Sequence, residues 1–370
     1  MAGAAYRSLV MRVLILQEFA VLLATAALAC CLALPSLAAD AYKVEELGAL
    51  HGGSSIGTAL NLSGQVVGWS GFRDGGETSA FLRSRPGSLL ALGTLPNGDY
   101  SAAFAINKFG TVVGRSNTGT STHAFLWTGD GGLRDLGVLP GDNSSAASDI
   151  NDRGEVVGVS TGPRGPHAFL WTKVLGMRTL GQVGSEARGV NASGAIVGVV
   201  KGASGDTAFL WTARDGMVNL GTLPGDLTSE AGRISDSERI VGSSTGSGGT
   251  RAVMWTKDRE IQNLGTLHSG DYSSAFDINN SGQIVGTSDT SLGSRAFLWT
   301  RETGMVDLNT LIPSNSNIVL TSAQAINERG QIVAIGGTHH DLTRDRMMDM
   351  DDDQHAGPVH VFLLTPSVTR

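Results

Sequence analysis

The acidic segment Thr338 to Pro358 holds the side chains best suited to bind a metal ion. Carboxylates alternate with other residues there and a histidine follows, which gives the possible ligands Asp349, Asp351, Asp353 and His355. The pattern resembles the start of a calcium loop. Gln354, however, stands where an EF-hand requires glycine, and His360 stands where its bidentate glutamate belongs. We expect a solvated loop, with a weak calcium site as the alternative, and no resident cofactor.

Two serines have the spacing of a hydrolase nucleophile. Gly-x-Ser-x-Gly occurs around Ser160 and around Ser244. A nucleophile elbow requires a strand before the serine and a helix after it. In both places a β-rich run leads into a Ser/Gly loop and a further β-rich run, so we predict no catalytic role for either serine.

Aspartates and histidines recur at fixed places along the chain. Gly-Asp pairs contain Asp99, Asp142, Asp226 and Asp271, and histidines precede three apolar runs at His123, His167 and His360. The aspartates allow a binding ring on one face, but aspartate in such turns commonly bonds to nearby backbone, which is the interpretation we favour. The histidines belong to the second, third and seventh units, so we do not expect them to converge as zinc ligands.

These residues belong to an internal repeat of about 44 residues. The turn asparagine or its substitute recurs at spacings of 46, 44, 40, 44, 44 and 48, at Asn61, Asn107, Asn151, Asn191, Ser235, Asn279 and Asn327. Each unit holds four short β-rich runs separated by turn residues, and Asn-x-x-Gly between the first two is typical of a hairpin. Seven such units predict an all-β, seven-bladed β-propeller of four-stranded repeats.

The third run of each unit is continuously apolar. It reads Ala-Phe-Leu-Trp in four units and Ala-Val-Met-Trp in a fifth, and its tryptophans are Trp127, Trp171, Trp211, Trp255 and Trp299. A strand without alternation is expected where both sheet faces are buried, as between neighbouring blades. We therefore predict that the tryptophans pack between blades, although a role in stacking on carbohydrate is the alternative.

The two ends of the repeat array complement each other. Tyr42 to Leu50 matches a fourth run with no earlier runs before it, whereas the seventh unit stops after its third run at His360 to Leu364. We predict that the first strand completes the last blade and closes the ring, which leaves no open sheet edge.

The N-terminus has the features of an export signal. Arg7 and Arg12 precede an apolar run, and small residues follow it, so we predict a signal peptide at 1–39 cleaved after Ala38 or Ala39, with Met1 or Met11 as the start. One propeller domain then fills 40–370, with an insertion at 338–358. An uncleaved membrane anchor and a lipoprotein are the alternatives. Both cysteines lie inside the signal, and the net charge of -7 gives no basic surface for nucleic acid.

The repeat motifs resemble a known family. The strings His123 to Trp127 and His167 to Trp171 both read His-Ala-Phe-Leu-Trp. The first is followed by Leu-Gly-x-Leu and Ile-Asn-x-x-Gly-x-x-Val-Gly, and the second by close variants of both motifs. These motifs are similar to those of the HAF family of probable extracellular repeat proteins, and the similarity covers nearly the whole mature chain. In four units the histidine position holds another residue: Ser79, Thr207, Arg251 and Arg295. The resemblance implies export and repetition, but no established activity.

Two function classes remain after these observations. The first is a secreted or periplasmic, non-catalytic binding or scaffold propeller, monomeric and without a membrane span after cleavage, whose ligand is an unknown glycan or protein. The second is a glycan-active hydrolase or lyase, which would require a carboxylate pair roughly 5 to 9 Å apart near the central channel. A fold of this kind does not choose between them.

Overall fold

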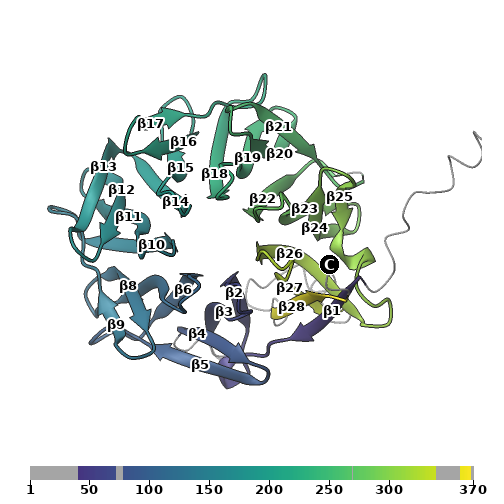
Figure 1. Cartoon of the computed structure of the whole chain (residues 1–370), viewed down its shortest axis with the longest axis horizontal. Helices are drawn as coiled ribbons and strands as arrows, with labels where there is room; N and C mark the ends of the chain where they lie inside the picture. The colour runs from purple at the N-terminus through teal and green to yellow at the C-terminus, as the bar shows by residue number, and fades with distance from the viewer. Residues whose placement is uncertain (1–40, 72–77, 269, 339–358, 368–370) are drawn as a thin grey trace, which may run out of the picture.

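The computed structural model describes residues 41–71, 78–268, 270–338 and 359–367, and in these ranges the chain forms seven four-stranded antiparallel sheets arranged as a ring (Figure 1). The predicted seven-bladed β-propeller is therefore confirmed. In each blade the strand nearest the centre of the ring comes first in the repeat. In the last blade the outermost strand is β1, from the N-terminal end of the described chain. Blades 1 to 6 are consecutive in sequence, and blade 7 contains β26, β27, β28 and β1.

The strands occupy equivalent places in every blade. The innermost strands are β2 (Ser55–Leu60), β6 (Ser101–Ile106), β10 (Ser144–Ile150), β14 (Ser185–Val190), β18 (Thr228–Ile234), β22 (Ser273–Ile278) and β26 (Ile318–Ile326). The second strands are β3 (Val66–Gly71), β7 (Val112–Asn117), β11 (Val156–Gly162), β15 (Ile196–Val200), β19 (Ile240–Gly246), β23 (Ile284–Thr290) and β27 (Ile332–Thr338).

The outer half of each blade follows the same order. The third strands are β4 (Thr78–Arg85), β8 (Thr122–Thr128), β12 (Gly165–Thr172), β16 (Thr207–Thr212), β20 (Gly249–Trp255), β24 (Gly293–Thr300) and β28 (His360–Pro366). The outermost strands are β5 (Ser88–Gly93), β9 (Gly132–Asp135), β13 (Gly176–Val183), β17 (Gly216–Asn219), β21 (Ile261–Gly265), β25 (Gly304–Asp307) and β1 (Tyr42–Glu46), and two short 3₁₀ turns, η1 (Leu50–Gly52) and η2 (Leu308–Thr310), lie between blades.

The ring closes as the two ends of the sequence predict. β1 pairs antiparallel with β28, from Tyr42 opposite Pro366 to Glu46 opposite Phe362. Two side-chain contacts hold this strand in addition to the backbone pairing: Glu45 forms an ion pair with Arg83 of blade 1, and Glu46 Oε1 lies 2.6 Å from His360 Nδ1. The N-terminal strand is thus bound to blades 1 and 7 at once.

The core lies between the blades. Each hydrophobic cluster joins neighbouring sheets, as where Val67 of blade 1 packs with Phe125 of blade 2. The third-strand tryptophans take part, so their predicted packing role is confirmed: Trp255 is fully buried, and Trp171 and Trp299 are 5% and 7% exposed. Trp127 and Trp211 pack at the edges of two clusters and are only half-buried.

The turn asparagines do more than shape hairpins. Each asparagine Oδ1 accepts one or two backbone N–H groups of its own turn, and its Nδ2 donates to the backbone oxygen at the equivalent position of the next blade, as at Asn61 and Asn279. The Nδ2–O distances range from 3.0 to 3.3 Å at Asn61, Asn107, Asn151, Asn191, Asn279 and Asn327. This circle of hydrogen bonds is interrupted at blade 5, because Ser235 has no amide to reach Asn279.

We call the end of the ring that carries these turns the turn face. The opposite end carries the junctions between blades and the loops from second to third strands, and we call it the junction face. The insertion Thr338 to Pro358 follows β27, but apart from Thr338 it lies outside the described residues.

Candidate functional site

The innermost strands share a bulge that sets which side chains they display. The pairing register between first and second strands shifts at the same repeat position in all seven blades. An extra residue of this kind bends a strand and re-aims a side chain. The residues at this position are all partly exposed, and they are Thr58, Phe104, Ser148, Arg188, Gly232, Phe276 and Gln324.

Blades 4 and 5 place charges where the other blades have uncharged residues. Arg188 stands at the bulge of β14, and two residues before that position β14 and β18 carry Glu186 and Glu230. The equivalent residues of blades 1 and 2 are Ile56 and Ala102. Arg188 Nη1 lies 2.5 Å from Glu230 Oε2, and Arg188 Nη2 lies 3.5 Å from Glu186 Oε2. One guanidinium therefore bridges two carboxylates from adjacent blades.

The loop after β15 extends this group toward the junction face. Lys201 Nζ lies 2.8 Å from Asp206 Oδ2 and 4.0 Å from Glu230 Oε1. The hydrogen bond to Asp206 raises the pKa of Lys201, and nearby carboxylates add to the effect. The five side chains, which we call the axial network, are each between 30% and 39% exposed, and they are Glu186, Arg188, Lys201, Asp206 and Glu230.

A second, more buried set of charges lies one position after the bulge. Asp149 of blade 3 and Asp277 of blade 6 accept backbone hydrogen bonds from the next blade, from Val190 at 2.9 Å and Ile326 at 2.8 Å. Arg233 occupies the same repeat position in blade 5, and its Nη1 lies 3.8 Å from Asp149 Oδ2. Its nearest partner is a backbone oxygen, that of Arg188, at 2.6 Å.

Burial changes the acidity of both carboxyls. Desolvation raises the pKa of Asp277 to about 6, against the opposing effects of Arg233 and of the backbone N–H groups. Desolvation also raises the pKa of Asp149, and the charge of Arg233 opposes it. A carboxyl with a pKa near neutral is the kind of group that general acid–base catalysis uses. Each carboxyl already accepts hydrogen bonds from two backbone N–H groups, and these bonds stabilise the fold.

The serines of the two Gly-x-Ser-x-Gly matches make structural contacts. Ser160 and Ser244 lie on second strands and are fully buried. Their Oγ atoms accept from the backbone N–H groups of Leu139 and Leu223, each at 3.0 Å, which anchors the preceding junction to the blade. A buried hydroxyl that accepts a backbone hydrogen bond between two strands is not an exposed nucleophile.

The junction aspartates also have structural contacts, although with different partners from those expected. Asp99 accepts from the Asn117 side chain, and Asp226 Oδ2 accepts from Ser244 Oγ at 2.7 Å. Asp142 Oδ2 lies 3.2 Å from His167 Nδ1 in a buried contact that lacks hydrogen-bond geometry. At Asp99 and Asp226 the carboxylate thus bonds a side chain of the following second strand, rather than the backbone two residues on.

The repeat histidines stand in separate blades, each beside one carboxylate. His123 Nδ1 lies 2.9 Å from Asp135 Oδ2, and the partners of the other two are Asp142 and Glu46. Within the described ranges no three His, Cys, Asp or Glu side chains are grouped as a metal site would require. The calcium-loop candidates Asp349, Asp351, Asp353 and His355 lie outside the described residues, as does the predicted signal peptide at 1–39.

Sequence reasoning missed the axial network, although a signal was present. Glu186 and Glu230 occupy a repeat position that is Ile56, Ala102 and Ala146 in the first three units. Charges at an otherwise uncharged position of a repeat indicate a role that the fold itself does not require. The contact between Arg188 and both glutamates needed the register of neighbouring blades, which the sequence does not contain.

In the described part of the chain no helix has the length and apolarity to cross a membrane. No protein-family model matches the sequence, and no curated protein matches it. Solved propellers resemble it in fold. Virginiamycin B lyase from Staphylococcus aureus is 11% identical over 88% of this chain and 99% of that one, with a TM-score of 0.53.

Two further solved structures have the same TM-score of 0.53. YCF48 bound to D1 peptide is 10% identical over 90% of this chain and 97% of that one. The β-propeller domain of the Trilobed protease from Pyrococcus furiosus is 10% identical over 86% of this chain and 97% of that one. At such identities the likeness shows the fold alone. This chain is similar in fold to a lyase, to a peptide-bound protein and to a domain of a protease, and the fold is compatible with binding or with catalysis.

Proposed function

We propose that this chain is an exported, non-catalytic binding propeller whose axial network recognises a peptide segment carrying charges of both signs. The axial network is the observation that supports this proposal. Its five charged side chains are partly exposed and alternate in sign from Glu186 through Arg188 and Glu230 to Lys201 and Asp206. A ligand that carries an ammonium and a carboxylate can replace such contacts with equivalent ones.

The fold does not need these charges. Blades 1 and 2 form the same strands with Ile56 and Ala102 at the position of the two glutamates. Partly exposed ion pairs contribute little to stability, about 0 to 1 kcal/mol each. Five such residues on adjacent blades are therefore better explained by recognition than by folding.

A peptide fits the site better than a neutral glycan. Sugar-binding sites use exposed aromatic faces, and the tryptophans of this repeat are largely used between the blades. The bulge position does offer Phe104 and Phe276, both partly exposed, on the innermost strands of blades 2 and 6. These phenyl groups can receive apolar side chains of a peptide on either side of the charged blades.

A carboxylate-dependent hydrolase or lyase is the second candidate, favoured by the raised pKa of Asp277. Catalysis would require that Asp277 or Asp149 reach a substrate. Their oxygens accept backbone hydrogen bonds between blades, so both groups support the ring as they stand. The binding function remains the proposal we favour.

Export and family membership are part of the same proposal. The His-Ala-Phe strings and the N-terminal apolar run support a secreted or periplasmic member of the HAF family that acts as a monomer. Immunoblotting of culture medium, periplasm and membranes, with mass spectrometry of the mature N-terminus, tests this. A processed N-terminus at Ala39 or Asp40 outside the cytoplasm is expected, and an unprocessed cytoplasmic chain would contradict it.

An array of charged and neutral peptides, with a glycan array beside it, tests the binding proposal on residues 40–370. The test variant is Arg188→Met/Glu230→Gln, which removes the central ion pair with little change in volume. The matched control is Arg153→Met/Glu155→Gln, which removes an exposed ion pair on the turn face of blade 3. We expect peptides of mixed charge to bind the parent and the control but not the test variant. Selective glycan binding, or equal peptide binding by all three proteins, would refute the proposal.

A further inference from the structure

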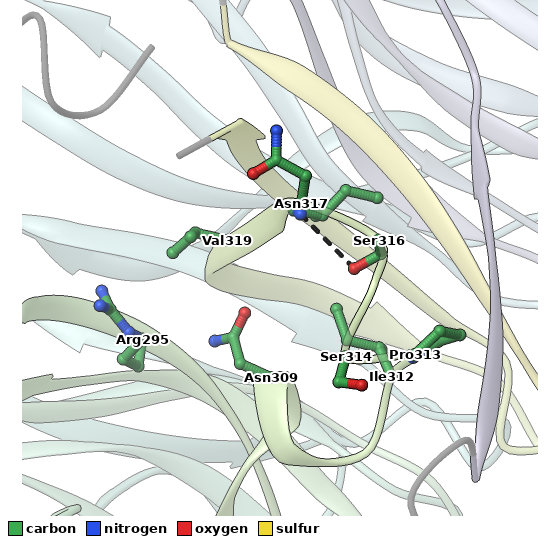
Figure 2. Close-up of a pocket in the computed structure, with 9 residues that line it drawn as sticks. Arg295, Asn309, Ile312, Pro313, Ser314, Ser316, Asn317 and Val319 are labelled. Carbon is green, nitrogen blue, oxygen red and sulfur yellow. Dashed lines mark hydrogen bonds between the residues drawn. The ribbon is translucent and has the colours of Figure 1, made fainter. Parts of the chain in front are cut away.

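A pocket of about 160 Å³ lies on the junction face between blades 6 and 7, away from the axial network. Figure 2 shows its lining, which comes from the start of β24, from η2 and from the long junction that leads to β26. The pocket is smaller than the roughly 300 to 1,000 Å³ of sites for drug-sized ligands, so it suits a small group or the end of a chain.

The lining has one charge and no opposing one. Arg295 is the only ionisable side chain among the nine lining residues, and the polar remainder is neutral: Asn309, Ser314, Ser316 and Asn317. Four apolar side chains from the junction and from β26 complete the wall. A cation beside hydroxyl and amide groups favours an anion, and the apolar wall favours one attached to a carbon skeleton.

Arg295 is available for such a contact. Among the described residues its guanidinium makes one hydrogen bond, from Nη1 to the backbone oxygen of the adjacent Ser294 at 2.9 Å. An arginine has five N–H donors in a planar fork that matches a carboxylate. Most of its donors are therefore free to bind a ligand.

The equivalent residue of blade 5 shows what is different here. Arg251 occupies the same repeat position, and its Nη1 donates to the backbone oxygens of Thr250 and of Asp271, which lies in the junction to blade 6. The junction to blade 7 is longer and contains η2. There Asn309 Oδ1 accepts from the backbone N–H of Leu320, and Asn309 Nδ2 donates to the backbone oxygen of Leu320. With the backbone bound this way, the chain leaves a pocket beside Arg295.

We propose that this pocket binds a carboxylate, with the Arg295 guanidinium as its principal partner. The carboxylate can be the C-terminus of a peptide or the acid group of a uronic sugar. The site is separate from the axial network, and the variants that test it leave every residue of the axial network unchanged.

Titration calorimetry on residues 40–370 tests this with two matched pairs of probes: N-acetyl-leucine against its amide, and glucuronate against glucose. We expect at least one of the two acids to bind and its neutral partner not to bind. Arg295→Gln should weaken acid binding by at least about tenfold, because a charge-assisted fork is lost. Arg251→Gln, the matched control, should leave the affinity within about twofold.

The outcomes separate the possible sources and the possible errors. Binding of N-acetyl-leucine alone identifies a peptide C-terminus, and binding of glucuronate alone identifies an acidic glycan. Equal affinity of the parent and Arg295→Gln, equal binding of an acid and its neutral partner, or no heat from either acid would overturn the proposal. Arg295→Lys, which keeps the charge but loses the fork, serves if the glutamine variant does not fold, and it should bind more weakly than the parent.

Discussion

Trp255→Ala tests the packing between blades where it is tightest. The Trp255 side chain is fully buried against blade 4, and its Nε1 donates to the backbone oxygen of Leu220 at 3.0 Å. Truncation of a buried tryptophan costs about 3 to 5 kcal/mol, and the Leu220 oxygen left without its partner adds about 1 kcal/mol. We therefore expect the free energy of unfolding to fall by about 4 to 6 kcal/mol.

Urea unfolding followed by far-ultraviolet circular dichroism measures this loss. Trp255→Phe keeps most of the packing and removes the donor, so it should cost less than the alanine variant. Trp211→Ala is the matched control, because Trp211 occupies the same repeat position but is only half-buried. If Trp255→Ala lost under about 1 kcal/mol, or if Trp211→Ala cost as much, the packing account would be wrong.

Four further changes test the ring itself. Ser235→Asn should complete the circle of turn asparagines and raise the free energy of unfolding by about 1 kcal/mol in the same assay. Asn107→Ala should lower it by about 2 to 3 kcal/mol, because three hydrogen bonds are lost. If Ser235→Asn gave no gain, the interruption at blade 5 would not be explained by a missing hydrogen bond. Because the pKa of Asp277 rises from 3.8 to about 6 in the fold, its contribution to stability is present below pH 3.8 and is lost as the pH rises through 6. Asp277→Asn should flatten the stability profile across that window, and an unchanged profile would contradict the assigned acidity. Deletion of Tyr42 to Leu50 should sharply lower the melting temperature, because β28 then loses its outer partner, and a transition like that of the parent would contradict the closure.

The repeat made most of the fold predictable. The spacing of the turn asparagines identifies seven units, the uninterrupted Ala-Phe-Leu-Trp runs identify strands buried on both faces, and the incomplete ends identify β1 as the partner of β28. Each of these inferences depends on residues close in sequence or on a repeat position. The asparagine circle was not predictable in the same way, because Asn61 and Asn327 meet only when the ring closes.

The candidate sites were less predictable for a physical reason. Arg188 meets Glu230 across the innermost strands of two neighbouring blades, and the relative position of these strands cannot be read from the sequence. Arg295 stands out only by comparison with Arg251, whose Nη1 also donates to the backbone oxygen of Asp271 in the next junction. Repeats predict what the units share, and both sites arise where one unit differs from the rest.

The affinity of one mixed-charge peptide, selected on the array, tests the binding proposal most directly. Its dissociation constant is measured at low salt for the parent, for Arg188→Met/Glu230→Gln and for the turn-face control Arg153→Met/Glu155→Gln. We expect the axial variant to bind at least about tenfold more weakly and the control to bind within about twofold of the parent. Equal dissociation constants for the parent and the axial variant would show that the peptide binds elsewhere and that the axial network is not the recognition site.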